Sequence, residues 1–149
     1  MTTKFKIHKA FLNIVDDKIL LLQKTLADLK ESGTNETKST AGDKHETALA
    51  MLQIEQANKR AQLQDALEQR AALLTVNPEN INTKIKSGSL VKTNRGHFYI
   101  SVALGKLNIE GNSFTAISPQ SPLGAILMGK VALDSVTVNG NIFSIESVE

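Results

Sequence analysis

Apolar residues recur at alternating spacings of three and four from Phe5 to Leu29, and this repeat constrains the fold of the 149-residue chain more than any other feature. Such spacing keeps side chains on one face of a helix, so it predicts a coiled-coil seam on a helix from Lys4 to Glu31. At 1.5 Å per residue that helix is roughly 42 Å long. The seam residues are Phe5, His8, Leu12, Val15, Ile19, Leu22, Leu26 and Leu29.

A second helix is predicted from about His45 to Leu74, with a less regular apolar surface. Gln56, Lys59 and Arg60 interrupt its heptads. A long helix is marginal alone, and a short connection makes neighbouring helices pack antiparallel, so we expect a helical hairpin. The apolar surface is expected to consist of Leu49, Leu52, Ile54, Ala57, Ala61, Leu63, Leu67 and Leu74.

The joint between the two helices, Ser32 to Lys44, is polar and has no large apolar residue. We therefore expect an exposed connection at the far end of the hairpin.

The composition changes at the segment from Thr75 to Asn80. Residues 1–75 contain no proline and two glycines, whereas residues 76–149 contain three prolines and seven glycines. Alternating apolar residues in the second part predict strands. We expect an α+β protein with two domains. Residues 1–75 form an antiparallel two-helix coiled coil, and residues 76–149 form a small antiparallel sheet of four to six strands with one helix.

Two local motifs support this second domain. Asn139-Gly140 lies between alternating runs and predicts a type I′ hairpin turn. Ser121 suits a helix N-cap, Pro122 suits the first helical position, and Gly129 closes the short helix.

Composition excludes several classes of function. The chain has no cysteine, which removes thiolate metal sites and cysteine nucleophiles. Its net charge is only +2, too small for non-specific attraction to nucleic acid. None of its three histidines, His8, His45 and His97, has metal-ligand spacing, and no phosphate-binding or nucleophile motif is present. There is no apolar run long enough for a membrane span. We expect a cytoplasmic protein that is not itself an enzyme.

Asp43 and Glu46 form the one constellation that suggests chemistry. They are three residues apart at the predicted start of the second helix, so their side chains project to one side. This spacing fits a capping box, in which Asp43 is the N-cap. Two exposed carboxylates also offer oxygen ligands to Mg²⁺ when another molecule supplies the rest of its shell. The two roles are compatible.

Two segments resemble the Gre family of bacterial transcript-cleavage elongation factors. The residues from Gly42 to Ala48 (G-D-K-H-E-T-A) are similar to the family's G-D-x-x-E-N-A tip motif. The residues from Ile117 to Lys130 are similar to its I-S-x-x-S-P segment followed by L-x-G-K. The resemblance covers nearly the whole chain and implies a coiled coil followed by an FKBP-like domain.

The resemblance also implies a mechanism. The coiled coil enters the secondary channel of RNA polymerase, where Asp43 and Glu46 help to hold a catalytic Mg²⁺ of the polymerase. The polymerase then hydrolyses backtracked nascent RNA, which the factor meets only indirectly. The factor has no cofactor of its own and acts as a monomer. Docking of the second domain is assigned to Ser121, Pro122, Gly129 and Lys130.

Two positions depart from the family motif. Thr47 replaces the family's Asn, and Ala50 and Met51 stand near the place of a Tyr. A second function therefore stays open. It is a non-cleaving Gre-like regulator or inhibitor that binds RNA polymerase without supporting catalysis.

Overall fold

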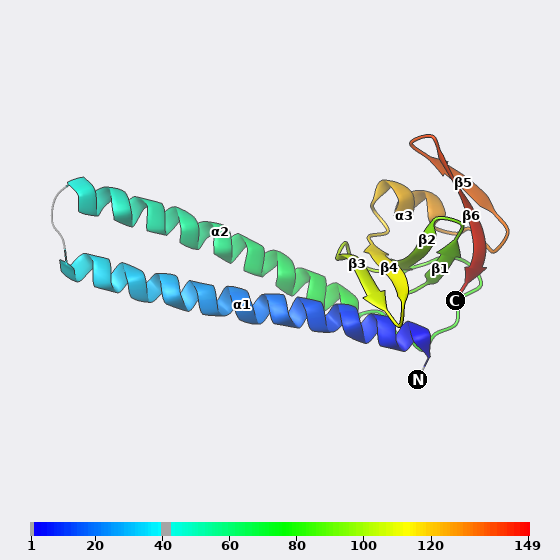
Figure 1. Cartoon of the computed structure of the whole chain (residues 1–149), viewed down its shortest axis with the longest axis horizontal. Coiled ribbons are helices and arrows are strands. Elements are labelled where there is room, and N and C mark those ends of the chain that lie inside the picture. The colour runs from blue at the N-terminus through cyan, green and yellow to red at the C-terminus, as the bar shows by residue number, and fades with distance from the viewer. Residues whose placement is uncertain (1, 40–42) are drawn as a thin grey trace. The chain divides into compact units, whose positions relative to one another are not determined.

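A computed structural model of the chain describes residues 2–39 and 43–149, apart from the side chains of residues 34–39 and 43–45. Two long helices come first, α1 (Thr3–Ser39) and α2 (Asp43–Leu74). They are followed by six strands and a short helix, α3 (Pro122–Leu127) (Figure 1). The strands are β1 (Leu90–Thr93), β2 (Gly96–Ile100), β3 (Gly105–Ile109), β4 (Asn112–Ile117), β5 (Ser135–Val138) and β6 (Asn141–Val148).

The contacts group the chain into two compact units. The hairpin unit is residues 14–70, and the sheet unit is residues 1–13 together with residues 71–149. Helix α1 thus begins in the sheet unit and continues into the hairpin unit. The predicted α+β class, with two long helices before a sheet domain, is confirmed. The FKBP-like assignment and the division at residue 75 remain predictions.

The two helices of the hairpin unit run antiparallel (Figure 1). Asp16 accepts a 2.7 Å hydrogen bond from Nε of Arg70. A methyl group added to Gly33 would lie 3.0 Å from a terminal carbon of Leu52. These two contacts fix the register of the two helices. Asp16, in the first half of α1, meets the last part of α2, and Gly33, in the last part of α1, meets the first half of α2. Along α1 the predicted seam is confirmed in this unit: Val15, Ile19 and Leu22 are buried, and Leu26 and Leu29 are half-buried.

The predicted apolar surface of α2 is partly wrong. Ile54 is 61% exposed and Leu67 is 42% exposed, and Ala57, Ala61 and Leu74 are also exposed. The shielded positions of α2 still follow alternating spacings of three and four, but several of them are polar. Long polar side chains can occupy a seam because their aliphatic stems cover apolar surface. They are Leu49, Leu52, Gln56, Lys59, Leu63, Ala66, Arg70 and Leu73.

The predicted non-helical joint from Ser32 to Lys44 is also wrong over most of its length. Helix α1 continues to Ser39, and α2 already begins at Asp43. A polar stretch indicates exposure but does not by itself end a helix, and this stretch holds no proline. Residues 40–42 lie outside the described part of the chain.

The sheet has the order β3-β4-β2-β1-β6-β5. It was predicted to be antiparallel, but β2 pairs with β4 in parallel, so the sheet is mixed. The remaining neighbours are antiparallel. The predicted Asn139-Gly140 turn is confirmed between β5 and β6, since both residues have the positive φ that a type I′ turn requires.

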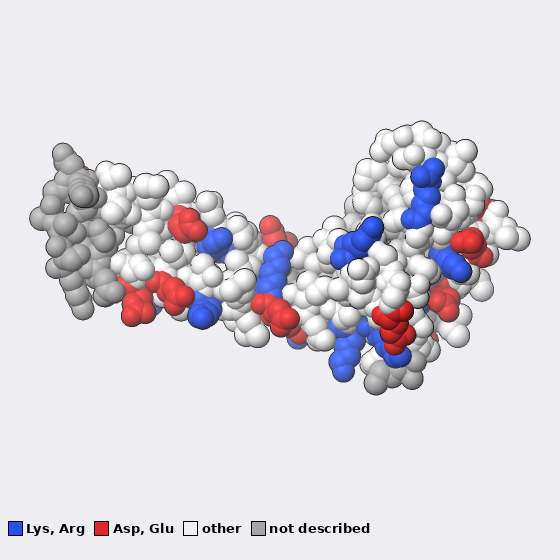
Figure 2. Space-filling model, viewed as in Figure 1, with Lys and Arg blue, Asp and Glu red and all other residues white. Residues whose placement is uncertain are grey.

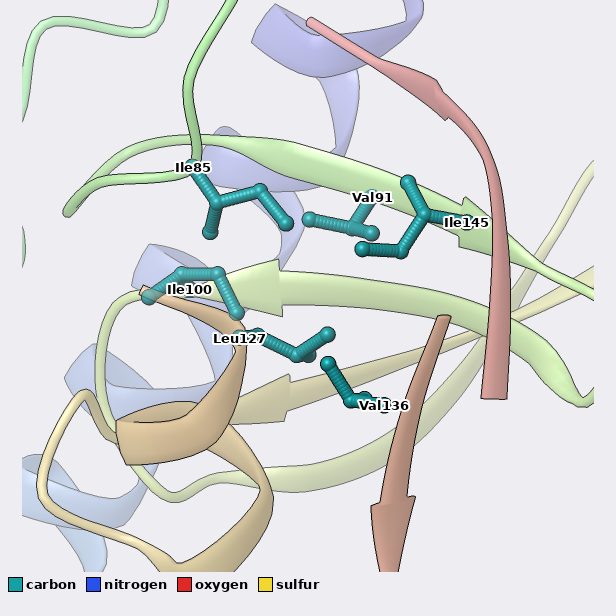
Figure 3. Close-up of a cluster of buried hydrophobic side chains, with 6 residues drawn as sticks. All are labelled: Ile85, Val91, Ile100, Leu127, Val136 and Ile145. Carbon is teal, nitrogen blue, oxygen red and sulfur yellow. The ribbon is translucent and has the colours of Figure 1, made fainter. Parts of the chain in front are cut away.

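Both faces of the sheet are covered. One face forms a core with α3, and its buried side chains meet in Figure 3. The other face carries Tyr99, whose ring stacks on Phe11 of α1 with 6.3 Å between centroids. The first turns of α1 therefore belong to the sheet unit rather than to the coiled coil. The core residues of the first face are Ile85, Val91, Ile100, Leu127, Val136 and Ile145.

Candidate functional site

The tip of the hairpin is where α1 ends and α2 begins. Ser39 and Asp43 are four positions apart in the chain, so these two helix ends lie at the same end of the hairpin (Figure 1). Asp43 is the first residue of α2, and Glu46 lies in its first turn with an exposed side chain. The structure therefore places both candidate residues at the tip, on one helical turn.

The side chain of Asp43 lies outside the described residues, and so do its predicted capping contacts. The capping box accordingly stays a prediction. What the backbone fixes is the spacing, because residues three apart on a helix project to the same side. The start of a helix carries a partial positive charge, which stabilises carboxylates there.

The chemistry of this pair is that of an incomplete cation site. Two carboxylates supply fewer oxygens than the octahedral shell of Mg²⁺ requires. Among the described side chains, no group of three or more His, Asp or Glu residues is arranged to hold a metal ion. Asp43 and Glu46 can thus assist a metal that another macromolecule already holds. They cannot complete its shell alone.

The surface of the hairpin unit carries no continuous patch of one charge in the face shown in Figure 2. Acidic and basic side chains are interspersed along the hairpin in that view. The tip carboxylates are therefore distinguished from the other acids of the hairpin by their place at a helix start.

The two histidines whose side chains the structure describes, His8 and His97, both pack against other residues of the sheet unit. His8 is buried, and its Nδ1 lies 2.7 Å from the hydroxyl of Tyr99 in a shared hydrogen bond. The ring of His97 packs on Phe114, with 4.8 Å between centroids. The side chain of His45 lies outside the described residues. The prediction that His8 is a packed residue is confirmed, although its partner is the sheet rather than α2.

The His8–Tyr99 contact predicts a pH dependence of stability. Burial lowers the pKa of His8 below its usual 6.5 and raises that of Tyr99. Between the lowered pKa of the folded state and about pH 6.5, the unfolded chain binds a proton at this histidine and the folded chain does not. The free energy of unfolding is thus expected to fall as the pH drops from about 6.5 toward the lower folded pKa. Urea unfolding at several pH values measures it. In His8→Gln this part of the slope should vanish, and an unchanged slope would contradict the assignment.

The segment with the second family motif forms α3 and its flanks. The predicted cap is confirmed: Ser121 Oγ accepts from the amide of Gly124 and donates to the carbonyl of Ser118. Pro122 occupies the first turn, and Gly129 has a φ of 81°. Lys130 is exposed. Of the four docking candidates, Ser121 is therefore already engaged in a cap, and Lys130 has a free surface position.

Gly124 is the residue of this segment that tolerates a side chain least. A methyl group there would overlap the carbonyl oxygen of Ser118 and would lie 2.8 Å from Ser121 Oγ. We expect Gly124→Ala to lower the free energy of unfolding by about 2 kcal/mol, because backbone must shift to relieve the overlap. Gly129→Ala is the control. It meets no atom within 4 Å and suffers only a strained φ, which costs about 1 kcal/mol. Denaturant unfolding of both variants checks this, and an equal loss in the two would contradict it.

Comparisons with known proteins add a likeness of structure. No family model matches the chain, and no curated protein matches it. A solved structure of the transcription factor Gfh1 covers 94% of this chain and is covered over 94% of its own, at 17% identity and a TM-score of 0.38. A crystal structure of the GreA factor homolog 1 (Gfh1) protein of Thermus thermophilus covers 95% of this chain at 15% identity. It is covered over 94% of its own length, with a TM-score of 0.34.

At these identities the likeness does not extend to individual residues. The roles of Asp43 and Glu46 therefore depend on the sequence and helices of this chain.

Proposed function

We propose that the chain is a Gre-like transcription elongation factor that binds RNA polymerase through the secondary channel and stimulates cleavage of backtracked RNA. The observation that carries this proposal is the place of the G-D-x-x-E motif. It opens the second helix of an antiparallel hairpin, with the Glu46 side chain exposed in the first turn. A hairpin with carboxylates at its tip suits delivery of negative charge into a narrow channel.

In this proposal the residues of the chain position charge and do no covalent chemistry. The helix start holds Asp43 and Glu46 on one side, where their oxygens can contact a cation and orient water. The Mg²⁺ belongs to the polymerase and supplies charge stabilisation for phosphodiester hydrolysis. Preorganised carboxylates suit this role because they need no rearrangement when the metal arrives.

The sheet unit is assigned the docking role. Support for this assignment comes from three exposed residues, which are Ile126 and Lys130 of the second family motif and Leu133 just beyond it. Leu133 is 89% exposed and Ile126 is 40% exposed. Exposed apolar residues next to a cation suit a protein interface. No described helix has the length and apolarity to cross a bilayer.

A second candidate is a Gre-like regulator that binds polymerase and does not support cleavage. Thr47 and Met51 favour it, because they depart from the family motif close to the tip carboxylates. Met51 is 67% exposed, so an apolar side chain lies near the place where the family carries a Tyr.

An RNA cleavage assay on backtracked polymerase from the same organism tests the proposal. Added wild-type chain is expected to speed the shortening of the 3′-labelled transcript in the presence of Mg²⁺. If the chain binds the polymerase and leaves cleavage unchanged or slower, the second candidate replaces the first. If it does not bind the polymerase, both fail.

A further inference from the structure

A cavity lies beside the segment that connects α2 to β1. Its volume is about 370 Å³, and it is lined by seven of the residues from Thr75 to Ser87 and by Met128, which follows α3. All of these residues belong to the sheet unit. The volume lies within the range of small-molecule sites, and it is larger than one or two water molecules need.

Asn82 is the first observation that points to a ligand. Its side chain is only 6% exposed and lines the cavity. No hydrogen bond of its side-chain amide is found within the described part of the chain, and the amide is not among the fully buried polar atoms that lack a partner, so solvent in the cavity reaches it. The amide of Asn82 therefore offers both a donor and an acceptor to whatever fills the cavity.

The loop around Asn82 is held in place by hydrogen bonds that do not use the cavity. Asn77 Oδ1 accepts from the amide of Glu79 at 3.0 Å. The carbonyl of Asn80 accepts from the ammonium of Lys4 at 2.6 Å. Both asparagines also line the cavity, so their amide nitrogens remain as further donors in a wall with fixed backbone.

Charge selects the class of ligand. Lys86 is the one ionised side chain among the described residues that line the cavity, and no carboxylate lines it. Its backbone is fixed by the hydrogen bond from its amide to Ser89 Oγ, and the structure gives its ammonium no salt bridge within the described chain. Its charge helps to lower the pKa of Lys4, so it raises the local positive potential. Val76 and Met128 add an apolar wall.

We propose that this cavity binds a small organic anion, with its phosphate or carboxylate group on Lys86 and Asn82 and its apolar body against Val76 and Met128. Hydrogen bonds from an ammonium and from amides to an oxyanion are the strong kind. This site belongs to the sheet unit and shares no residue with the tip. The proposal of an anion site therefore does not depend on the function proposed above.

Three probes that share a benzene ring test the site on the full chain. Phenyl phosphate and benzoate carry the two anionic groups, and benzyl alcohol carries none. Titration followed by ¹H–¹⁵N NMR is expected to give saturable shifts of the Asn82 side-chain amide with at least one anion. The tighter anion identifies the group the site takes. Benzyl alcohol should bind about tenfold more weakly, because it lacks the charge-assisted hydrogen bonds.

Lys86→Met tests the charge and has a close control in Lys84→Met, because both lysines are exposed and only Lys86 lines the cavity. Lys86→Met should weaken binding of the anion about tenfold, and Lys84→Met by less than about twofold, since outside the cavity salt screens the charge. Asn82→Asp should abolish binding by repulsion. Equal effects of the two lysine variants, equal binding of benzyl alcohol, or no saturable shift at Asn82 would each overturn the proposal. If Asn82→Asp does not fold, the comparison of Lys86→Met with Lys84→Met still tests whether the cavity binds the anion.

Discussion

The double substitution Asp43→Asn with Glu46→Gln is expected to abolish stimulation of RNA cleavage while leaving binding to the polymerase intact. Both changes remove charge and keep shape. Asn and Gln still cap a helix, so the hairpin should keep its fold. The loss should be about a hundredfold or more, which is typical when a preorganised electrostatic contact to a transition state is removed. Initial rates of transcript shortening, with polymerase saturated by the factor, measure it.

The chain offers a matched control for this variant. Asp65 and Glu68 lie on the same helix with the same spacing, and both are exposed. Asp65→Asn with Glu68→Gln removes the same charge from the last third of α2, far along the helix from the tip, and should leave cleavage unchanged. Equal cleavage with wild type and tip variant would contradict the role of the tip. An equal loss in both double variants would mean that net charge matters and position does not.

Leu22→Ala is expected to lower the free energy of unfolding by about 2–4 kcal/mol. The side chain is 6% exposed in the seam of the hairpin unit, so its removal leaves a cavity between the helices. Because the tip must be held by a stable pair of helices, the same variant should also weaken stimulation of cleavage at temperatures near its unfolding transition. Chemical denaturation followed by circular dichroism measures the stability.

Leu21→Ala provides the control, because the neighbouring leucine is 64% exposed on the outside of the same helix. It should cost less than about 0.5 kcal/mol. Similar losses in the two variants would mean that the seam register along α1 is misassigned.

The sequence predicted those features of the fold that a local residue pattern determines by itself. The seam of α1 from Val15 to Leu29, the cap at Ser121 and the Asn139-Gly140 turn are examples. Each depends on spacing or on one residue's backbone preference, and both are present in the sequence.

The prediction for the surface of α2 failed because packing overrides residue type. Lys59 and Arg70 lie in the seam of α2, and Ile54 lies outside it. Register is fixed by the neighbouring layers, and long polar side chains can cover apolar surface with their stems. The parallel pairing of β2 with β4 could not be predicted from local sequence patterns either, because it depends on how segments distant in the sequence pack together.

The candidate site was predictable in position but not in its surroundings. The motif identified Asp43 and Glu46, and the structure places them at the start of α2. Sequence patterns did not point to Asn82 or Lys86. A single asparagine in a polar loop carries no signal, and only its burial beside a cavity distinguishes it.

Fe²⁺ in place of the catalytic Mg²⁺ of RNA polymerase gives the most direct test of the central claim, that the hairpin tip reaches the metal. Hydroxyl radicals formed at that metal cut the polypeptide nearest to it. With the chain bound, cuts are expected around residues 42–46 and none in the strands between Gly96 and Ile117. Cuts confined to the sheet unit, or a bound chain that is not cut at all, would contradict the account.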